Sequence, residues 1–173
     1  MTPSNAGTPP SADASLRLER WSATSGSERR SRANLVLYGG GHRWRANADG
    51  NGAIDALMRA VDNALAPLLG DGVVLAAYDV DADAAGHESS ATISVSVRRR
   101  DDPSGPLYSG RAAHENVLEA SVVAYVDAVN ALLADEGVDI ALAVPTPGAT
   151  ARHNADSDHR SLATDRIMSV YNE

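Results

Sequence analysis

The same order of predicted elements occurs twice in this chain of 173 residues, and the repetition limits the folds open to it. Residues 16–70 hold three segments with strand character and then one with helical spacing, and residues 73–137 repeat that succession. Strands in close succession pair as antiparallel hairpins, and a helix that follows them covers one face of the sheet. The duplication predicts an α+β fold of two tandem βββα units, with the strands in one or two antiparallel sheets packed against two helices.

In the first unit, strands are expected over 16–21, 33–38 and 42–46, separated by polar and glycine turns. A helix follows, with Asn51 or Asp49 as its capping residue. Its apolar residues recur at helical spacing and form one stripe: Ile54, Leu57, Met58, Val61, Leu65 and Leu68.

In the second unit, strands are expected over 73–82, 91–97 and 107–112, and a helix over 116–134 that ends before Gly137. The first of these strands alternates between acidic and apolar side chains, which lie on opposite faces of a strand. We expect Tyr78, Val80 and Ala82 to face inward, with Asp79, Asp81 and Asp83 facing water.

The two ends of the chain have a different composition. Residues 1–15 are rich in Pro, Ser, Thr, Ala and Gly without apolar periodicity, which predicts a disordered N-terminal tail. Residues 139–173 form a polar C-terminal tail in which a short helix is expected near 161–171. The expected domain therefore covers residues 16–138.

Composition removes several classes of function. Fifteen basic and 23 acidic residues give a net charge of −8, which argues against binding to nucleic acid. No apolar run reaches the ~18 residues of a membrane span, and no signal peptide pattern begins the chain, so we expect a cytoplasmic protein. Without cysteine or lysine, thiolate and Schiff-base chemistry are excluded. The histidines have no metal-ligand spacing, so we expect no metal. The sequence also has no recognisable catalytic constellation, so we expect no catalytic residue and no cofactor.

The segment Asp49-Gly-Asn-Gly-Ala53 is the most informative motif. Glycine permits left-handed backbone angles and close approach of a ligand. The first turn of a helix offers free N–H groups and a positive dipole end, which suit a small carboxylate. An ordinary helix cap explains the same residues without a ligand, and the residues alone leave both interpretations open.

Several short motifs follow one another along the chain: Gly50-Asn-Gly52, Ile54-Asp-Ala56, Tyr78, Glu119-Ala-Ser121, Ala124-Tyr125 and Ala128-Val-Asn130. Taken together in order and spacing, they resemble the C-terminal regulatory domain of 2-isopropylmalate synthase and of the related citramalate synthases. The resemblance covers residues 16–134. It implies a dimerising domain that binds leucine, or isoleucine in the citramalate enzymes, as a feedback inhibitor.

The resemblance also implies an effector pocket between the two units. The backbone at the start of the first helix would hold one side of the effector, the strand over 73–82 would line the apolar side, and the start of the second helix would close it. The residues carried over by position are Gly50, Asn51, Gly52, Ala53, Ile54, Leu75, Tyr78, Ala82 and Val117.

This chain departs from the family pattern at three places. Ala53 replaces a proline, Asn116 stands where aspartate is common, and Gly110-Arg-Ala112 lacks one of two paired glycines. In the resembling synthases, a catalytic (β/α)₈ barrel condenses acetyl-CoA with a ketoacid. This chain is too short for such a barrel of about 250 residues, so we expect it not to catalyse that condensation alone.

Three hypotheses follow. The first is a stand-alone allosteric domain, a homodimer that binds leucine or a related branched-chain amino acid and regulates leucine biosynthesis in trans through a separate synthase catalytic chain. The second is a dimerisation or scaffold module that has kept the fold and lost the ligand. The third, a small enzyme of unrelated chemistry, has no catalytic constellation to support it.

Overall fold

The computed structural model describes residues 15–82 and 90–145. In the first unit, β1 (Arg17–Gly26), β2 (Arg29–Gly39) and β3 (His42–Gly50) precede helix α1 (Ala53–Ala64) and the short helix α2 (Ala66–Leu69). The three strands form an antiparallel sheet in the order β1-β2-β3. The expected succession of three strands and a helix is confirmed in this unit.

The second unit repeats the pattern with β4 (Val73–Ala82), β5 (Ala91–Arg99), β6 (Tyr108–His114) and helix α3 (Val117–Asp135). Its strands form a second antiparallel sheet in the order β4-β5-β6. The α+β fold class is confirmed, and the open alternative is settled in favour of two sheets. A short 3₁₀ turn, Ile140–Leu142, follows α3.

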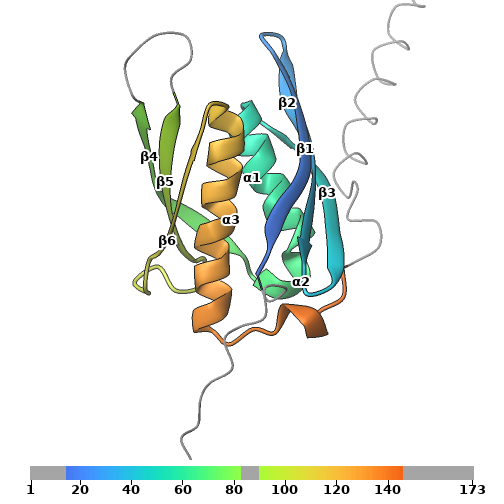
Figure 1. Ribbon diagram of the computed structural model, residues 1–173, viewed down its shortest axis with the longest axis vertical. Helices are drawn as coiled ribbons and strands as arrows, with labels where there is room; N and C mark the ends of the chain where they lie inside the picture. The colour runs from blue at the N-terminus through green and yellow to red at the C-terminus, as the bar shows by residue number, and fades with distance from the viewer. Residues whose placement is uncertain (1–14, 83–89, 146–173) are drawn as a thin grey trace, which may run out of the picture.

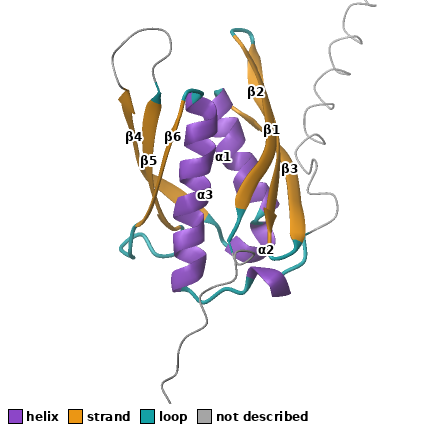
Figure 2. Ribbon diagram, viewed as in Figure 1, coloured by secondary structure: helices purple, strands orange, loops and turns teal. Residues whose placement is uncertain are grey.

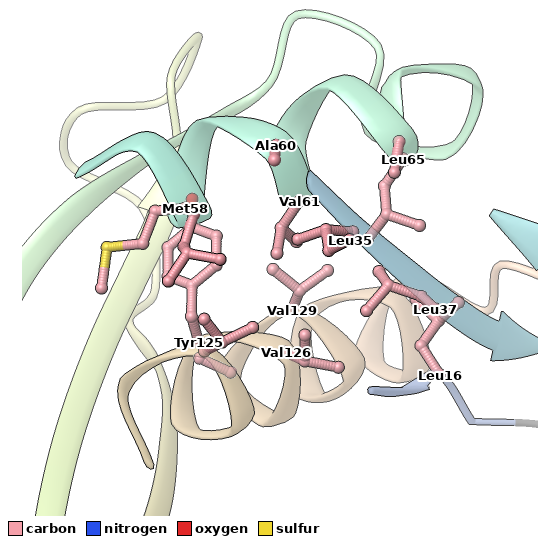
Figure 3. Close-up of a cluster of buried hydrophobic side chains, with 14 of the residues drawn as sticks. Leu16, Leu35, Leu37, Met58, Ala60, Val61, Leu65, Tyr125, Val126 and Val129 are labelled. Carbon is pink, nitrogen blue, oxygen red and sulfur yellow. The ribbon is translucent and has the colours of Figure 1, made fainter. Parts of the chain in front are cut away.

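Helices α1 and α3 lie side by side between the two sheets (Figures 1 and 2). Helix α1 packs on β3 and β2, and α3 packs on β6 and β5. The close-up shows Met58 beside Tyr125 and Val61 beside Val129, so the two helices run parallel and begin at the same end of the molecule (Figure 3). All four of these side chains are buried.

Two glycines set the distance between each sheet and its helix. A Cβ added to Gly110 of β6 would lie 2.1 Å from the carbonyl oxygen of Ala124 in α3. At Gly50 of β3, an added Cβ would lie 2.4 Å from the backbone nitrogen of Ala56 in α1. Each helix therefore rests directly on the backbone of the strand that precedes it.

The two units differ in how their first strands are covered. The start of β1 is held against α3 of the other unit through Leu16, the residue just before the strand. The Leu16 N–H donates to Asn130 Oδ1 at 2.9 Å, and Asn130 Nδ2 donates to the Leu16 carbonyl oxygen at 2.8 Å. Strand β4 lies at the outer edge of its sheet, to the side of the helices, and α3 packs on β6 and β5 instead, so the helix-facing side of β4 is largely open (Figure 1).

The open side of β4 corrects the prediction that Val80 and Ala82 are buried. Val80 and Ala82 lie on the expected side of β4, since they pair with Ile93 and Ala91 of β5. They are nevertheless exposed, and Val80 keeps 51% of its surface. Their burial was wrongly predicted because alternation fixes the face of a strand but not whether another element covers that face.

Helix α3 is long and apolar enough to cross a membrane by length and composition, but 56% of its most apolar stretch is buried inside the fold. It is the core helix of the second unit. The expected short helix near 161–171 and the expected N-terminal tail, apart from Ser15, lie outside the described residues. Ile140 of the 3₁₀ turn belongs to the buried core.

Candidate functional site

The start of α1 has no side-chain cap. Gly52 occupies the N-cap position, and no side chain bonds the first N–H groups from there. Both expected caps are therefore wrong. Asp49 instead pairs across the sheet with Arg32 at 2.8 Å. Asn51 precedes the cap, and its backbone N–H donates to Asp55 Oδ2 at 2.9 Å.

The glycines at this start do not adopt the left-handed backbone angles that glycine permits. Neither Gly50 nor Gly52 has a positive φ, and Gly52 is extended with φ −152°. Gly50 is needed for close packing on α1, whereas a Cβ added to Gly52 would meet no atom within 4 Å. The structure therefore leaves open space in front of α1 at Gly52.

Helix α3 begins with a regular cap at the residue where the prediction placed it. The Asn116 side chain accepts the backbone N–H of Leu118 at 2.9 Å. The N–H of Asn116 in turn donates to His114 Nδ1 at 2.9 Å. Asn116, at the position where the resembling proteins commonly have aspartate, therefore caps α3 with its side chain.

A hydrogen-bonded chain joins β4 to the first turn of α3. The Ser121 hydroxyl donates to the carbonyl oxygen of Val117 at 2.6 Å, and Tyr78 Oη lies 2.7 Å from Ser121 Oγ. Because the Ser121 hydrogen is already used, the Tyr78 hydroxyl is the donor in the second bond. Two of the predicted site residues, Tyr78 and Val117, are thereby connected.

Glu119 is a second polar group at this start. Its Oε2 accepts the indole N–H of Trp21 at 3.3 Å, and its Oε1 lies 3.7 Å from His114 Nε2. Trp21, Glu119 and Ser121 were not among the predicted site residues. The available signal was the Glu119-Ala-Ser121 motif, which supported the resemblance but was not assigned to the site.

The predicted residues fall into two groups in space. Residues 50–54 and Val117 lie at the starts of α1 and α3, Tyr78 is hydrogen-bonded to Ser121 of α3, and Ala82 ends β4. The last part of β4 lies toward the same end of the molecule as the two helix starts (Figure 1). Leu75 lies toward the other end of β4, about 20 Å from Ala82 along an extended strand. It is 46% exposed and lines a separate hollow of about 380 Å³ with Arg98 and Arg100. One amino-acid ligand does not span both groups.

Charges near the helix starts are held in defined pairs. Burial raises the pKa of the Asp55 carboxyl, but the Asn51 N–H and the Arg59 guanidinium lower it, and the net pKa lies below the ordinary value. Deeper between the helices, burial raises the pKa of Asp62 to about 6, against the opposing effects of the Tyr125 hydroxyl and nearby arginines.

Together these observations define a duplicated α+β module whose uncovered edge strand β4 lies beside the start of α3, with the start of α1 on the other side of α3 (Figure 1). Among residues 15–82 and 90–145, no three acidic or histidine side chains cluster in a way that could hold a metal ion. The chain belongs to the LeuA allosteric (dimerisation) domain family, whose model matches residues 6–133. The resemblance inferred from the short motifs is confirmed.

The similar full-length proteins are much longer than this chain. The 2-isopropylmalate synthase of Nitrosospira multiformis is 33% identical over 100 residues, which make up 58% of this chain and 18% of that protein. A probable 2-isopropylmalate synthase of Methanopyrus kandleri is 32% identical over 123 residues, or 71% of this chain and 24% of that protein. A putative (R)-citramalate synthase of the same organism is 26% identical over 123 residues, with the same coverage.

Proposed function

We propose that this chain is an allosteric domain that forms a homodimer, binds a branched-chain amino acid, leucine first, and regulates a 2-isopropylmalate synthase catalytic chain in trans. The observation that carries the proposal is the open apolar face of β4 beside the start of α3, in a member of the LeuA allosteric family.

The dimer part of the proposal rests on the difference between β1 and β4. The helix-facing side of β4 carries Leu75, Tyr78, Val80 and Ala82, and Leu75 and Val80 are 46% and 51% exposed. Apolar surface of this kind favours burial against a partner at roughly 25 cal/mol per Å². A second copy of the chain would supply the cover that α3 gives to β1.

The effector part rests on the chemistry at the helix starts. Free N–H groups near Gly52 suit the carboxylate of an amino acid, and Glu119 suits its ammonium group. Tyr78, Val80 and Ala82 would contact the aliphatic side chain, whose burial contributes about 1.5–3 kcal/mol. Site residues Asn51, Ala53 and Ile54 would line the same space, with Val117 closing it.

One observation favours the alternative of a dimerisation module without a ligand. The Asp55 carboxylate accepts the Asn51 N–H and places a negative charge at the start of α1. That charge opposes a second carboxylate at the same helix start. The alternative keeps the dimer and predicts no amino-acid binding.

Thermal unfolding of the purified chain with leucine, isoleucine, valine and, as a control, glutamine separates these functions. A ligand at ~100 times its Kd stabilises a protein by about 2.7 kcal/mol, which raises the Tm of a domain this size by several degrees. We expect such a shift with leucine and none with glutamine. No shift with any branched amino acid, together with a dimer in sedimentation equilibrium, would establish the alternative.

A further inference from the structure

The outer face of the β1-β2-β3 sheet, which points away from the helices, has a charge opposite to that of the whole protein. Residues 17–50 contain seven of the 15 basic residues and three of the 23 acidic ones, in a chain of net charge −8. The proposed function does not use this surface. We name it the arginine face, formed by Arg17, Arg20, Arg29, Arg30, Arg32, Arg43 and Arg45.

The strand register arranges four of these arginines around two residues of the central strand, Val36 and Tyr38. Strands lie about 4.8 Å apart, and successive residues of one face about 7 Å apart, so the four positions outline an area of about 10 by 7 Å. The two rows across the sheet are Arg20–Val36–Arg45 and Arg17–Tyr38–Arg43.

Acidic side chains neutralise only part of this charge. Arg43 is bound by Glu19 at 2.8 Å, and Arg32 by Asp49 at 2.8 Å. Within residues 15–82 and 90–145, no carboxylate lies within 4.0 Å of the guanidinium groups of Arg17, Arg20 or Arg45.

The arginine face continues into a hollow at the β1–β2 hairpin, which projects beyond the helix starts (Figure 1). The hollow has a volume of about 660 Å³, and its lining includes three arginines (Arg29, Arg30 and Arg32), two acidic residues (Glu28 and Asp49) and the hydroxyl residues Thr24 and Ser25. Cationic and hydroxyl donors therefore follow the sheet from the row at Tyr38 to the hairpin, a length of about 25 Å.

The surroundings of Tyr38 distinguish between two kinds of anionic partner. The guanidinium carbons of Arg17 and Arg43 lie 4.6 and 5.8 Å from the ring centroid and come from the strands on either side. Single-stranded nucleic acid binds by stacking its bases on exposed aromatic rings. The one aromatic ring of this face is already covered by guanidinium groups, whose remaining N–H groups suit carboxylates.

We propose that the arginine face docks an extended acidic segment of another protein. A segment of about eight residues in extended conformation matches the ~25 Å length of the face. Aspartate and glutamate side chains pair with Arg17, Arg20 and Arg45, while Val36 and the uncharged row at Asn34 contact its backbone and small side chains. Charge complementarity supplies the selectivity.

The test measures fluorescence anisotropy of a labelled ten-residue glutamate peptide titrated with the full chain at 50 and 300 mM salt. The neutral ten-residue glutamine peptide and a ten-nucleotide thymidine strand are the comparison ligands. Arg45→Glu is the test variant. Arg111→Glu is its matched control, since Arg111 is exposed on the corresponding strand β6 and the change in net charge is the same.

We expect the glutamate peptide to bind at 50 mM salt and to bind more weakly at 300 mM. Its affinity at 50 mM salt should be higher than that of either comparison ligand. Arg45→Glu should weaken binding about fivefold or more, and Arg111→Glu less than twofold. The proposal is overturned by absence of glutamate binding, by equal loss in the two variants, or by tighter binding of the thymidine strand. Circular dichroism of both variants verifies that each is folded.

Discussion

The hydroxyl of Tyr125 in α3 donates a hydrogen bond to Asp62 Oδ1 in α1 at 2.8 Å, and this bond joins the two units through their central helices. Tyr125 is 2% exposed. Burial and the neighbouring Asp62 charge raise the pKa of the Tyr125 hydroxyl, so it remains a donor throughout the physiological range.

The pair makes stability depend on pH. The pKa of Asp62 rises from 3.8 to about 6 on folding, so the folded state holds the proton more tightly than the unfolded state. The resulting stabilisation is complete below about pH 4 and is lost as the pH rises through 6. At pH 7.5 the buried charge costs up to about 3 kcal/mol of unfolding free energy.

Asp62→Asn should therefore stabilise the protein at pH 7.5 by about 1–3 kcal/mol, because the amide oxygen still accepts from Tyr125 without carrying a charge. Urea unfolding at pH 5 and 7.5 measures the effect. The wild type should gain stability between pH 7.5 and 5, and the variant should lack that gain. An identical pH dependence in both proteins would show that Asp62 titrates normally.

Tyr125→Phe tests the other side of the bond. The variant leaves the Asp62 carboxylate without its donor, so we expect a loss of about 1–3 kcal/mol at pH 7.5. The loss should be smaller at pH 5, where a larger share of Asp62 is protonated. Urea unfolding at the two pH values again provides the measurement, and a loss that does not vary with pH would indicate lost packing alone.

Gly110→Ala should destabilise the fold. Its added Cβ would lie 2.1 Å from the Ala124 carbonyl oxygen and 2.4 Å from the Ala128 nitrogen, so α3 has to shift away from β6. Overpacking of this kind costs about 1–3 kcal/mol. Gly26→Ala is the matched control, because its Cβ meets no atom within 4 Å and should change stability by less than about 0.5 kcal/mol. Equal effects in urea unfolding would contradict the proposed role of Gly110.

The sequence was sufficient for the element order because alternation and helical spacing are local properties. It could not identify the packing role of Gly50, since the close approach of Ala56 depends on how α1 returns onto β3. The Gly50-Asn-Gly52 pattern looked like backbone freedom for a ligand, whereas Gly50 serves packing and only Gly52 faces open space.

The candidate site was predictable only in part for the same reason. The start of α1 and the position of Tyr78 follow from local pattern, and the structure connects Tyr78 to α3 through Ser121. The contact of Trp21 with Glu119 joins residues 98 positions apart, and no local pattern identifies such a pair. Exposure of Val80 likewise depends on which element covers β4.

Val80→Glu should weaken the proposed dimer. The substitution places a charge on the open apolar face of β4, and burying it there would leave the carboxylate unpaired. Leu107→Glu is the control, because Leu107 is similarly exposed at 55% but lies outside β4. Sedimentation equilibrium should show a dissociation constant raised at least tenfold for Val80→Glu alone. Equal behaviour of both variants would place the interface elsewhere.

Gly52→Trp should abolish the leucine-dependent rise in Tm while leaving the dimer intact. The indole would fill the open space in front of α1 and block the N–H groups proposed to bind the effector carboxylate. Because a Cβ at Gly52 meets no atom within 4 Å, the substitution should not disturb packing.

Gly26→Trp adds the same side chain to open space at the β1–β2 hairpin and should keep the full leucine response. Thermal unfolding with and without leucine, combined with sedimentation equilibrium, separates loss of the site from loss of the dimer. A leucine shift that survives in Gly52→Trp would move the effector site away from the start of α1. The uncovered face of β4 around Tyr78 would then have to hold the ligand without the help of those N–H groups.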